Sequence, residues 1–325
     1  MNHSDFKAAW WLRSPHLQTL WPTLCRRPIK NLVITRERFE LPDGDFIDLD
    51  WVGNNNRPIV ILLHGLEGSI HSSYAKGMLN AIQNQGWRGV FMHFRCCSGE
   101  PNRLSRLYHS GETEDIAAVV HAITQREPET PLAAIGFSLG ANVLLKWLGE
   151  TNQQNPLKAA IAVSTPFELG KLVNRVNQGF SRVYQRYLLK KLHKKIQFKF
   201  QTQPAPIPIP PHSGMRTLRD FDEHITAPLH GFRNAEDYYT TSSSRQYLGN
   251  IAVPTLLLQS KDDPFMTEDL LPDPSELSAQ VILELMEKGG HLGFVSGPAP
   301  WRAQYWLENR APRFLRSYLQ QPEKR

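Results

Sequence analysis

Hydrophobic residues gather in short uninterrupted runs through the middle of this chain, and each run has the length of a β-strand. A run in which all residues are apolar predicts a strand buried on both faces, as in a parallel sheet covered by helices. Segments with helical spacing separate most of these runs, which favours an alternating α/β order. The predicted strands are 58–63, 89–94, 132–135, 159–163, 254–259 and 281–286, and the predicted helices include 72–85, 112–126 and 139–149.

Two segments near the start of the chain have a different pattern. Residues 31–41 and 45–52 alternate apolar and polar positions on either side of Pro42-Asp43-Gly44, which predicts a β-hairpin. Residues 1–30 are rich in aromatic side chains, and we expect them to form a lead-in that packs on the body of the protein.

Two predicted helices carry signals for their ends. Ser110 stands just before Glu112 and can cap the helix that begins there, where acidic residues suit the first turn. Residues 300–320 space their aromatic and aliphatic side chains at helical intervals. Pro312 lies inside this segment, and we expect it to break or kink the helix.

The stretch 166–248 contains no run that predicts a buried strand. It has helical pieces at 169–175 and 180–193, and its proline-rich part, 204–211, favours a stiff extended connector. Because it lies between two predicted sheet strands, we expect a largely helical cap inserted over the sheet's C-terminal edge. The predicted division is a lead-in (1–30), a core (31–165 and 249–325) and this cap (166–248).

Composition narrows the class of protein. The chain has 325 residues, 41% hydrophobic and 21% charged, which is typical of a soluble globular protein. Its three cysteines do not form a disulfide framework, and the common zinc motifs CxxC and HExxH are absent. The longest apolar run, 58–63, is too short for a membrane span, and the N-terminus does not resemble a signal peptide. We therefore expect a cytoplasmic protein without a transmembrane segment.

The net charge of +6 leaves two interpretations open. Much of the excess lies in the lysine-rich segment 190–199, which we interpret as the solvated face of a helix. The alternative is a non-catalytic protein that binds anionic surfaces through this segment. We expect no nucleic-acid partner.

The pentapeptide Gly136-Phe137-Ser138-Leu139-Gly140 falls between a predicted strand and a predicted helix. A serine with glycines two residues away on each side, at such a junction, is the pattern of a nucleophile elbow. The turn is so tight that side chains at the two glycine positions would collide with the strand and the helix. The pattern therefore predicts Ser138 as a nucleophile.

A serine nucleophile needs a base and an acid. His291 lies in a glycine-rich loop after the last predicted strand and is the candidate base. Asp263 and Asp262 follow the preceding strand, and since neighbouring side chains diverge, only one can face the histidine. We favour Asp263, which stands directly before a proline, while Glu168 is a weaker third candidate. The order Ser138, Asp263, His291 is typical of α/β-hydrolases.

The transition state of acyl transfer carries a negative oxygen that backbone N–H groups can stabilise. The predicted donors are the N–H of Leu139, directly after the nucleophile, and the N–H of Leu66. Leu66 lies in His64-Gly65-Leu66-Glu67-Gly68, directly after the strand 58–63.

With these residues in place, the chain resembles the α/β-hydrolase superfamily and, within it, the AB hydrolase 4 group. Besides the triad residues, the resemblance rests on longer strings spread over nearly the whole chain. These strings are 14–19, 108–115, 217–222, 226–229, 237–239 and 242–244. The resemblance implies a mostly parallel eight-stranded sheet whose second strand is antiparallel, with helices on both faces. It also implies a charge relay at Ser138, Asp263 and His291 and ester hydrolysis without a cofactor.

One position departs from the pattern of such hydrolases. The loop after their fourth strand often reads Arg-Gly, whereas here it reads Arg95-Cys96-Cys97. If that loop requires a positive φ angle, Cys96 is strained.

The sequence thus predicts a serine hydrolase that cleaves small-molecule or lipid-like carboxylic esters through an acyl-enzyme intermediate. Acyl transfer or thioester hydrolysis on the same triad is the alternative within enzymes. The physiological substrate and the oligomeric state stay open at this point.

Overall fold

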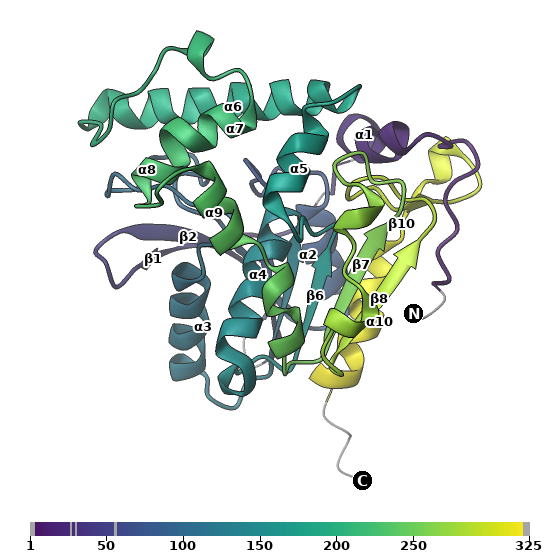
Figure 1. Cartoon of the computed structure of the whole chain (residues 1–325). Coiled ribbons are helices and arrows are strands. Elements are labelled where there is room, and N and C mark those ends of the chain that lie inside the picture. The colour runs from purple at the N-terminus through teal and green to yellow at the C-terminus, as the bar shows by residue number, and fades with distance from the viewer. Residues whose placement is uncertain (1–3, 27, 30, 55–56, 321–325) are drawn as a thin grey trace.

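The computed structural model describes residues 4–26, 28–29, 31–54 and 57–320. Eight strands form one central sheet in the order β1-β2-β4-β3-β5-β6-β7-β8 (Figure 1). The strands are β1 (Thr35–Glu40), β2 (Phe46–Val52), β3 (Ile59–Leu63), β4 (Arg88–Met92), β5 (Leu132–Phe137), β6 (Ala159–Val163), β7 (Thr255–Ser260) and β8 (Val281–Met286). Two further strands, β9 (Val295–Ser296) and β10 (Gln304–Tyr305), pair separately.

Strand β2 is antiparallel to both of its neighbours, and the strands from β4 to β8 are mutually parallel. The predicted eight-stranded sheet with an antiparallel second strand is therefore confirmed. The helices are α1 (Pro15–Cys25), α2 (Ala75–Gln83), α3 (Glu114–Arg126), α4 (Leu139–Thr151), α5 (Leu169–Val176), α6 (Ser181–Thr202), α7 (Leu218–Phe221), α8 (Ala227–Leu229), α9 (Ala235–Ser242) and α10 (Leu307–Leu319).

Helices cover both faces of the sheet because alternate residues of each strand point to opposite sides. Ile61 of β3 belongs to the apolar cluster that includes α3 and α4, whereas Leu62 belongs to the cluster that includes α2 and α10. Both side chains are fully buried. This explains why the strands read as uninterrupted apolar runs.

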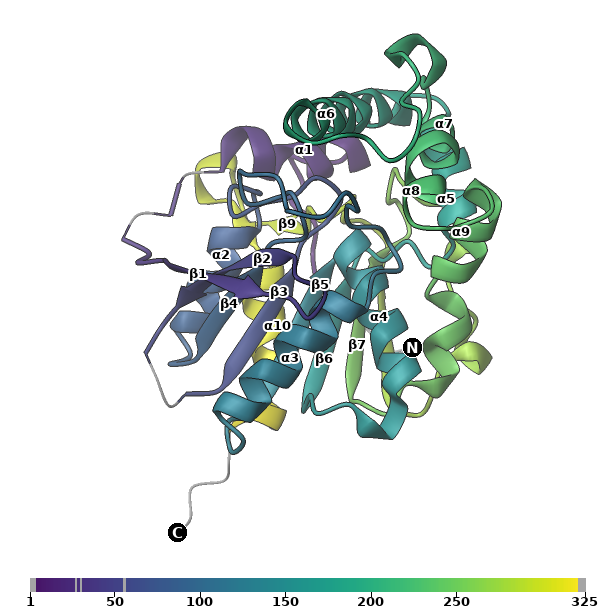
Figure 2. The ribbon, with the colours of Figure 1, turned by 90° about the vertical axis from the view of Figure 1, so that its left-hand side faces the viewer.

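Between β6 and β7 the described chain forms α5 to α9 and no strand. Figures 1 and 2 show α6, α7 and α8 above the sheet, with α5 leading up to them and α9 leading back down. A π-helical turn, Asp222–Thr226, joins α7 to α8. No helix in the described residues combines the length and the apolar character needed to cross a bilayer.

The helix predicted near Glu112 is confirmed to within two residues, but its predicted cap is wrong. Helix α3 begins at Glu114, and the Glu112 carboxylate accepts the N–H of Glu114 at 3.2 Å. Ser110 does not cap the helix, because its N–H donates to the Tyr238 hydroxyl at 3.0 Å and its own hydroxyl accepts from Tyr238 at 2.9 Å. Contact with a distant tyrosine therefore replaces the expected local cap.

The prediction for the last helix is wrong at its start, and the break that was one of the two expected effects of Pro312 does not occur. Residues 300–306 do not form its first turns but contain the strand β10, and α10 begins only at Leu307. The helix then passes through Pro312 without a break. Pro312 is only the sixth residue of the helix, so it removes a single bond of the ladder, and buried residues after it, such as Leu315, anchor the helix on the sheet.

The lysine-rich segment is only partly solvated. Helix α6 continues to Thr202, and Lys195 and Lys199 are buried, whereas Lys190 and Lys194 are exposed. Lys199 donates to the Asn102 side chain and to the carbonyl of Leu104, both at 2.6 Å. The interpretation as a solvated face is therefore wrong for these two buried lysines, which tie α6 to the core.

Candidate active site

Ser138 lies on a strained turn between β5 and α4. Its φ angle is +51°, a region that residues with a side chain rarely adopt. A Cβ atom at Gly136 would lie 2.5 Å from the Cα of Ala141, and one at Gly140 would lie 2.5 Å from the Leu63 carbonyl. The expected collisions with helix and strand are confirmed, and they explain why glycine is required at both positions.

The structure brings together the three residues that the sequence singled out. The Nε2 atom of His291 lies 3.0 Å from the Ser138 hydroxyl, and its Nδ1 atom lies 2.8 Å from Oδ2 of Asp263. With the proton on Nδ1, the histidine donates to Asp263 and accepts from the Ser138 hydroxyl. The side chain of Asp263 is fully buried, so its carboxylate is hydrogen-bonded by protein groups and is not exposed to solvent.

The two neighbouring aspartates contact different parts of the histidine loop. Asp263 faces the imidazole, while Oδ1 of Asp262 accepts the N–H of Gly290 at 2.9 Å. Glu168 points elsewhere and pairs with Arg245 and Lys171. The structure therefore places Asp263, and neither of the other two candidates, against His291.

Contacts that the sequence analysis did not predict hold His291 in place. Its backbone N–H donates at 2.9 Å to the hydroxyl of Thr19, which comes from α1. Its ring stacks on Phe265 with centroids 4.1 Å apart and planes tilted by 21°. Thr19 lies within the string 14–19 that supports the family resemblance, and this was the one available signal for it.

The loop after β3 lies directly beside the serine. A Cβ atom at Gly65 would be 3.2 Å from the Cβ of Ser138. Among the residues that the structure describes, neither the N–H of Leu66 nor that of Leu139 has a hydrogen-bond acceptor. The first N–H groups of a helix have no partner within it, which leaves the Leu139 donor available.

Glu67, the next residue of this loop, has a positive φ of 55° and is held by several side chains. Its N–H donates to the Tyr108 hydroxyl at 2.8 Å, and its carboxylate accepts from Tyr108 and from Lys195, each at 2.8 Å. Its carbonyl accepts from Lys191 at 3.2 Å. Both lysines come from α6, so a helix of the predicted cap holds the loop in position through these contacts.

Two neighbouring rings fix the other end of the same loop. The Tyr74 hydroxyl accepts the Gly65 N–H at 2.9 Å. His64 is fully buried, donates from Nδ1 to the Gly65 carbonyl at 2.7 Å and accepts the Phe94 N–H at Nε2. Burial lowers the pKa of His64 to about 3, so this ring is neutral and acts as a spacer rather than a base.

Cys96 has a φ angle of +61°, so the condition under which we expected strain at this residue is met. Cys97, beside it, lies with its Sγ atom 2.8 Å from Nζ of Lys195. Burial raises the pKa of the Cys97 thiol to about 12, which keeps it protonated and unreactive at neutral pH.

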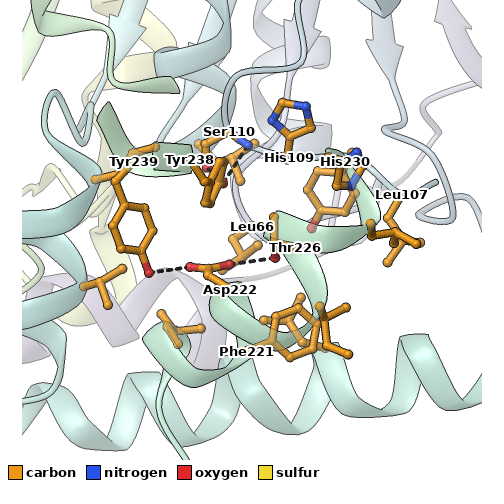
Figure 3. A pocket seen from close by; sticks show the side chains of 18 of the residues that line it. Leu66, Leu107, His109, Ser110, Phe221, Asp222, Thr226, His230, Tyr238 and Tyr239 are labelled. Carbon is orange, nitrogen blue, oxygen red and sulfur yellow. Dashed lines mark hydrogen bonds between the residues drawn. The ribbon is translucent and has the colours of Figure 1, made fainter. Parts of the chain in front are cut away.

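An apolar pocket opens where the core meets α5 to α9 (Figure 3). Leu66 and Leu139 line it from the core, and Val173, Phe221 and Ile225 line it from the other side. It contains about 690 Å³ of space between atoms, its open mouth included. Leu66 and Leu139, whose N–H groups are unpaired, thus belong to this lining, and Leu139 directly follows Ser138 in the chain.

Fold and geometry together define the class of this protein. The family model described as "alpha/beta hydrolase fold" matches residues 58–298, and the chain belongs to this family.

Comparisons of sequence and of fold identify proteins that this chain is similar to. The chain is 45% identical over 311 residues to the protein named "Putative esterase YheT" of Escherichia coli K12, covering 94% of this chain and 91% of the relative. It is 32% identical to "Phospholipase ABHD3" of Mus musculus, covering 83% and 68%. An esterase structure from Pyrococcus furiosus superposes with a TM-score of 0.61 at 17% identity over 89% and 92% of the two chains, which supports the fold alone.

Proposed function

We propose that this protein is a serine hydrolase that cleaves carboxylic esters. The observation that carries the proposal is the hydrogen-bonded series from Asp263 through His291 to Ser138, which ends beside two free backbone N–H groups. These are the parts that ester cleavage through an acyl-enzyme requires. The names of the relatives, an esterase and a phospholipase, support the same chemistry.

The reaction has two halves. In the first, the Ser138 oxygen attacks the ester carbonyl carbon, His291 takes the hydroxyl proton, and Asp263 stabilises the imidazolium. The N–H groups of Leu66 and Leu139 bind the oxyanion. The intermediate then collapses, the bond to the alcohol oxygen breaks, and His291 gives its proton to the leaving alcohol. In the second half, His291 takes a proton from water, which attacks the acyl-serine, and the proton returns to Ser138 as the acid leaves.

We further propose that residues 166–248 are the cap that selects the substrate. The apolar side chains that α5 to α9 contribute to the pocket favour an ester with an apolar part. The alternative of an anionic-surface binder loses support because Lys195 and Lys199 are buried in the core contact.

A fluorophosphonate probe combined with a chain-length series of aryl esters tests the proposal. The wild-type protein is expected to react with the probe and to hydrolyse the esters. Ser138→Ala is expected to lose labelling entirely and ester turnover by a factor of about 10³ or more. Labelling that survives the substitution would refute the assignment of the nucleophile. Running the esters with added alcohol and with matched thioesters separates hydrolysis from acyl transfer and thioesterase activity.

A further inference from the structure

The pocket contains one acidic side chain whose position nothing in the catalytic series explains. Asp222 lies in the π-helical turn between α7 and α8, and it lines a pocket whose walls are mostly leucine, isoleucine, valine and aromatic side chains. Figure 3 shows it between Tyr239 and Thr226. An ionised carboxylate in such surroundings is unfavourable unless its oxygens are hydrogen-bonded.

The protein fills only part of the hydrogen-bonding capacity of the Asp222 carboxylate. Oδ1 accepts the Thr226 hydroxyl at 2.7 Å and Oδ2 accepts the Tyr239 hydroxyl at 2.8 Å. Within the described residues no cation pairs with Asp222, since Arg219 pairs with Glu236 at 2.9 Å. A carboxylate can accept about four hydrogen bonds, so acceptor capacity is left over in a side chain that lines the pocket. Burial raises the pKa of Asp222 to about 6, as expected for incomplete compensation.

A second polar atom of the same pocket is also unfilled. The Nε2 atom of His230 is buried and has no hydrogen-bond partner among the described residues. Burial lowers the pKa of His230 to about 3, so the ring is neutral. The pocket therefore combines mostly apolar walls with a carboxylate whose spare acceptor capacity a bound molecule can use, while Lys195, also in the lining, pairs with Glu67.

We propose that Asp222 recognises the substrate, and that the pocket takes an ester whose apolar chain carries a hydrogen-bond donor, either a hydroxyl or an ammonium group. The inference rests on the proposed ester hydrolase and adds its substrate class. A hydroxyl is recognised by the carboxylate alone, whereas an ammonium group also gains from the aromatic faces of Phe221, Tyr238 and Tyr239 in the same lining. The shared requirement is a donor that the free carboxylate oxygens can accept.

The test compares aryl esters of straight-chain acids that end in a methyl, hydroxyl, ammonium or carboxylate group, each at several chain lengths. The wild-type enzyme is expected to favour the hydroxyl or the ammonium over the methyl end at one length. Asp222→Asn is expected to reduce that preference, measured as the ratio of kcat/KM values, by about tenfold or more, as for loss of a hydrogen bond to a charged group. The two donor arms show which donor is recognised.

Asp237→Asn is the matched control, because it removes one acidic charge from α9, where Asp237 pairs with the exposed Arg233 and does not line the pocket. It is expected to leave the ratio unchanged. An equal ratio in wild type and Asp222→Asn, no preference for either donor at any length, or a preference for the carboxylate end would overturn the proposal.

A second variant keeps the test decisive if Asp222→Asn fails to fold. Tyr239→Phe retains the carboxylate and frees Oδ2, so the preference for the donor-ended chain is expected to persist or increase. Its loss in a folded Tyr239→Phe protein contradicts the proposal. Binding of the corresponding non-hydrolysable amides, measured by calorimetry, reports on Asp222 even if none of the esters is hydrolysed. Failure of the proposed function is thereby distinguished from failure of this subsite.

Discussion

Asp262 and Asp263 are neighbours in sequence, yet their contacts predict very different effects of the same substitution. Asp263→Asn puts an amide against Nδ1 of His291 and favours the wrong tautomer of the ring, and we expect kcat to fall by about 10⁴-fold. In Asp262→Asn the amide oxygen can still accept the Gly290 N–H, so we expect a loss of less than about tenfold. Aryl-ester kinetics on both variants check this, and comparable losses would contradict the assignment of Asp263.

Asp222 leads to a second prediction, on stability and pH. Its pKa in the folded protein, about 6, lies above the usual 3.8, so the folded state holds the proton more tightly than the unfolded state. Asp222 therefore destabilises the folded state progressively as the pH rises from about 4 to above 6, by up to about 3 kcal/mol. We expect Asp222→Asn to melt higher than wild type at pH 8 and to lose this advantage at pH 4. A pH-independent difference in melting temperature would contradict the burial of an ionised carboxylate.

At the residue scale, the sequence predicts a feature when the contacts that cause it lie within a few residues in the chain. The collisions that require Gly136 and Gly140 involve atoms within a few residues or at the end of the adjacent strand, so the pentapeptide carries the signal. Thr19 is 272 residues from the His291 N–H that it accepts, and no local pattern marks such a contact. The role of Lys195 could not be predicted for the same reason. Its partner Glu67 is distant in sequence, and a run of lysines by itself indicates a solvent-exposed helix face.

At the scale of elements, helix α6 is connected to the loop after β3 by an ion pair and a hydrogen bond to Glu67. Lys195 is buried and pairs with Glu67, whose own backbone follows directly on the Leu66 donor. Lys195→Met leaves the Glu67 carboxylate without its cation and frees the loop to move away from Ser138. We expect kcat to fall about tenfold to hundredfold, because the oxyanion contact acts in the transition state, and KM to change as well, since Lys195 also lines the pocket.

The exposed Lys194 on the same helix provides the control. Lys194→Met removes the same charge from α6 without touching Glu67, and we expect kinetics close to wild type. Rates of fluorophosphonate labelling check the comparison independently of product release. If Lys195→Met folds and retains its kcat, the position of the loop does not depend on α6.

Elements themselves were predicted best where burial is uniform. The strands β3 to β8 are mostly apolar because both faces of the sheet are covered, and the predicted strands agree with the structure to within a few residues. Helix ends were predicted worst. Ser110 contacts the distant Tyr238 instead of capping α3, and residues before α10 pair with β9 instead of continuing the helix.

At the scale of the whole molecule, the lead-in segment belongs to the site although it is far from it in sequence. Gln18 of α1 is buried, and its side-chain amide donates to the Val295 carbonyl at 3.0 Å and accepts the Val295 N–H at 2.8 Å. One residue later, Thr19 accepts the N–H of His291. Helix α1 thus holds the loop that presents the base at His291 and at Val295, so the lead-in contributes to the position of the base.

Thr19 offers a test of this dependence because one replacement removes only its hydroxyl and another removes only its methyl group. Thr19→Val keeps the shape but leaves the buried His291 N–H without an acceptor, so the loop is expected to shift and kcat to fall about tenfold, with a loss of about 1–3 kcal/mol in the free energy of unfolding. Thr19→Ser retains the hydroxyl and is expected to restore most of kcat. Equal activity of the two variants, measured with one aryl ester and one fluorophosphonate probe, would show that α1 stabilises the fold without positioning the base.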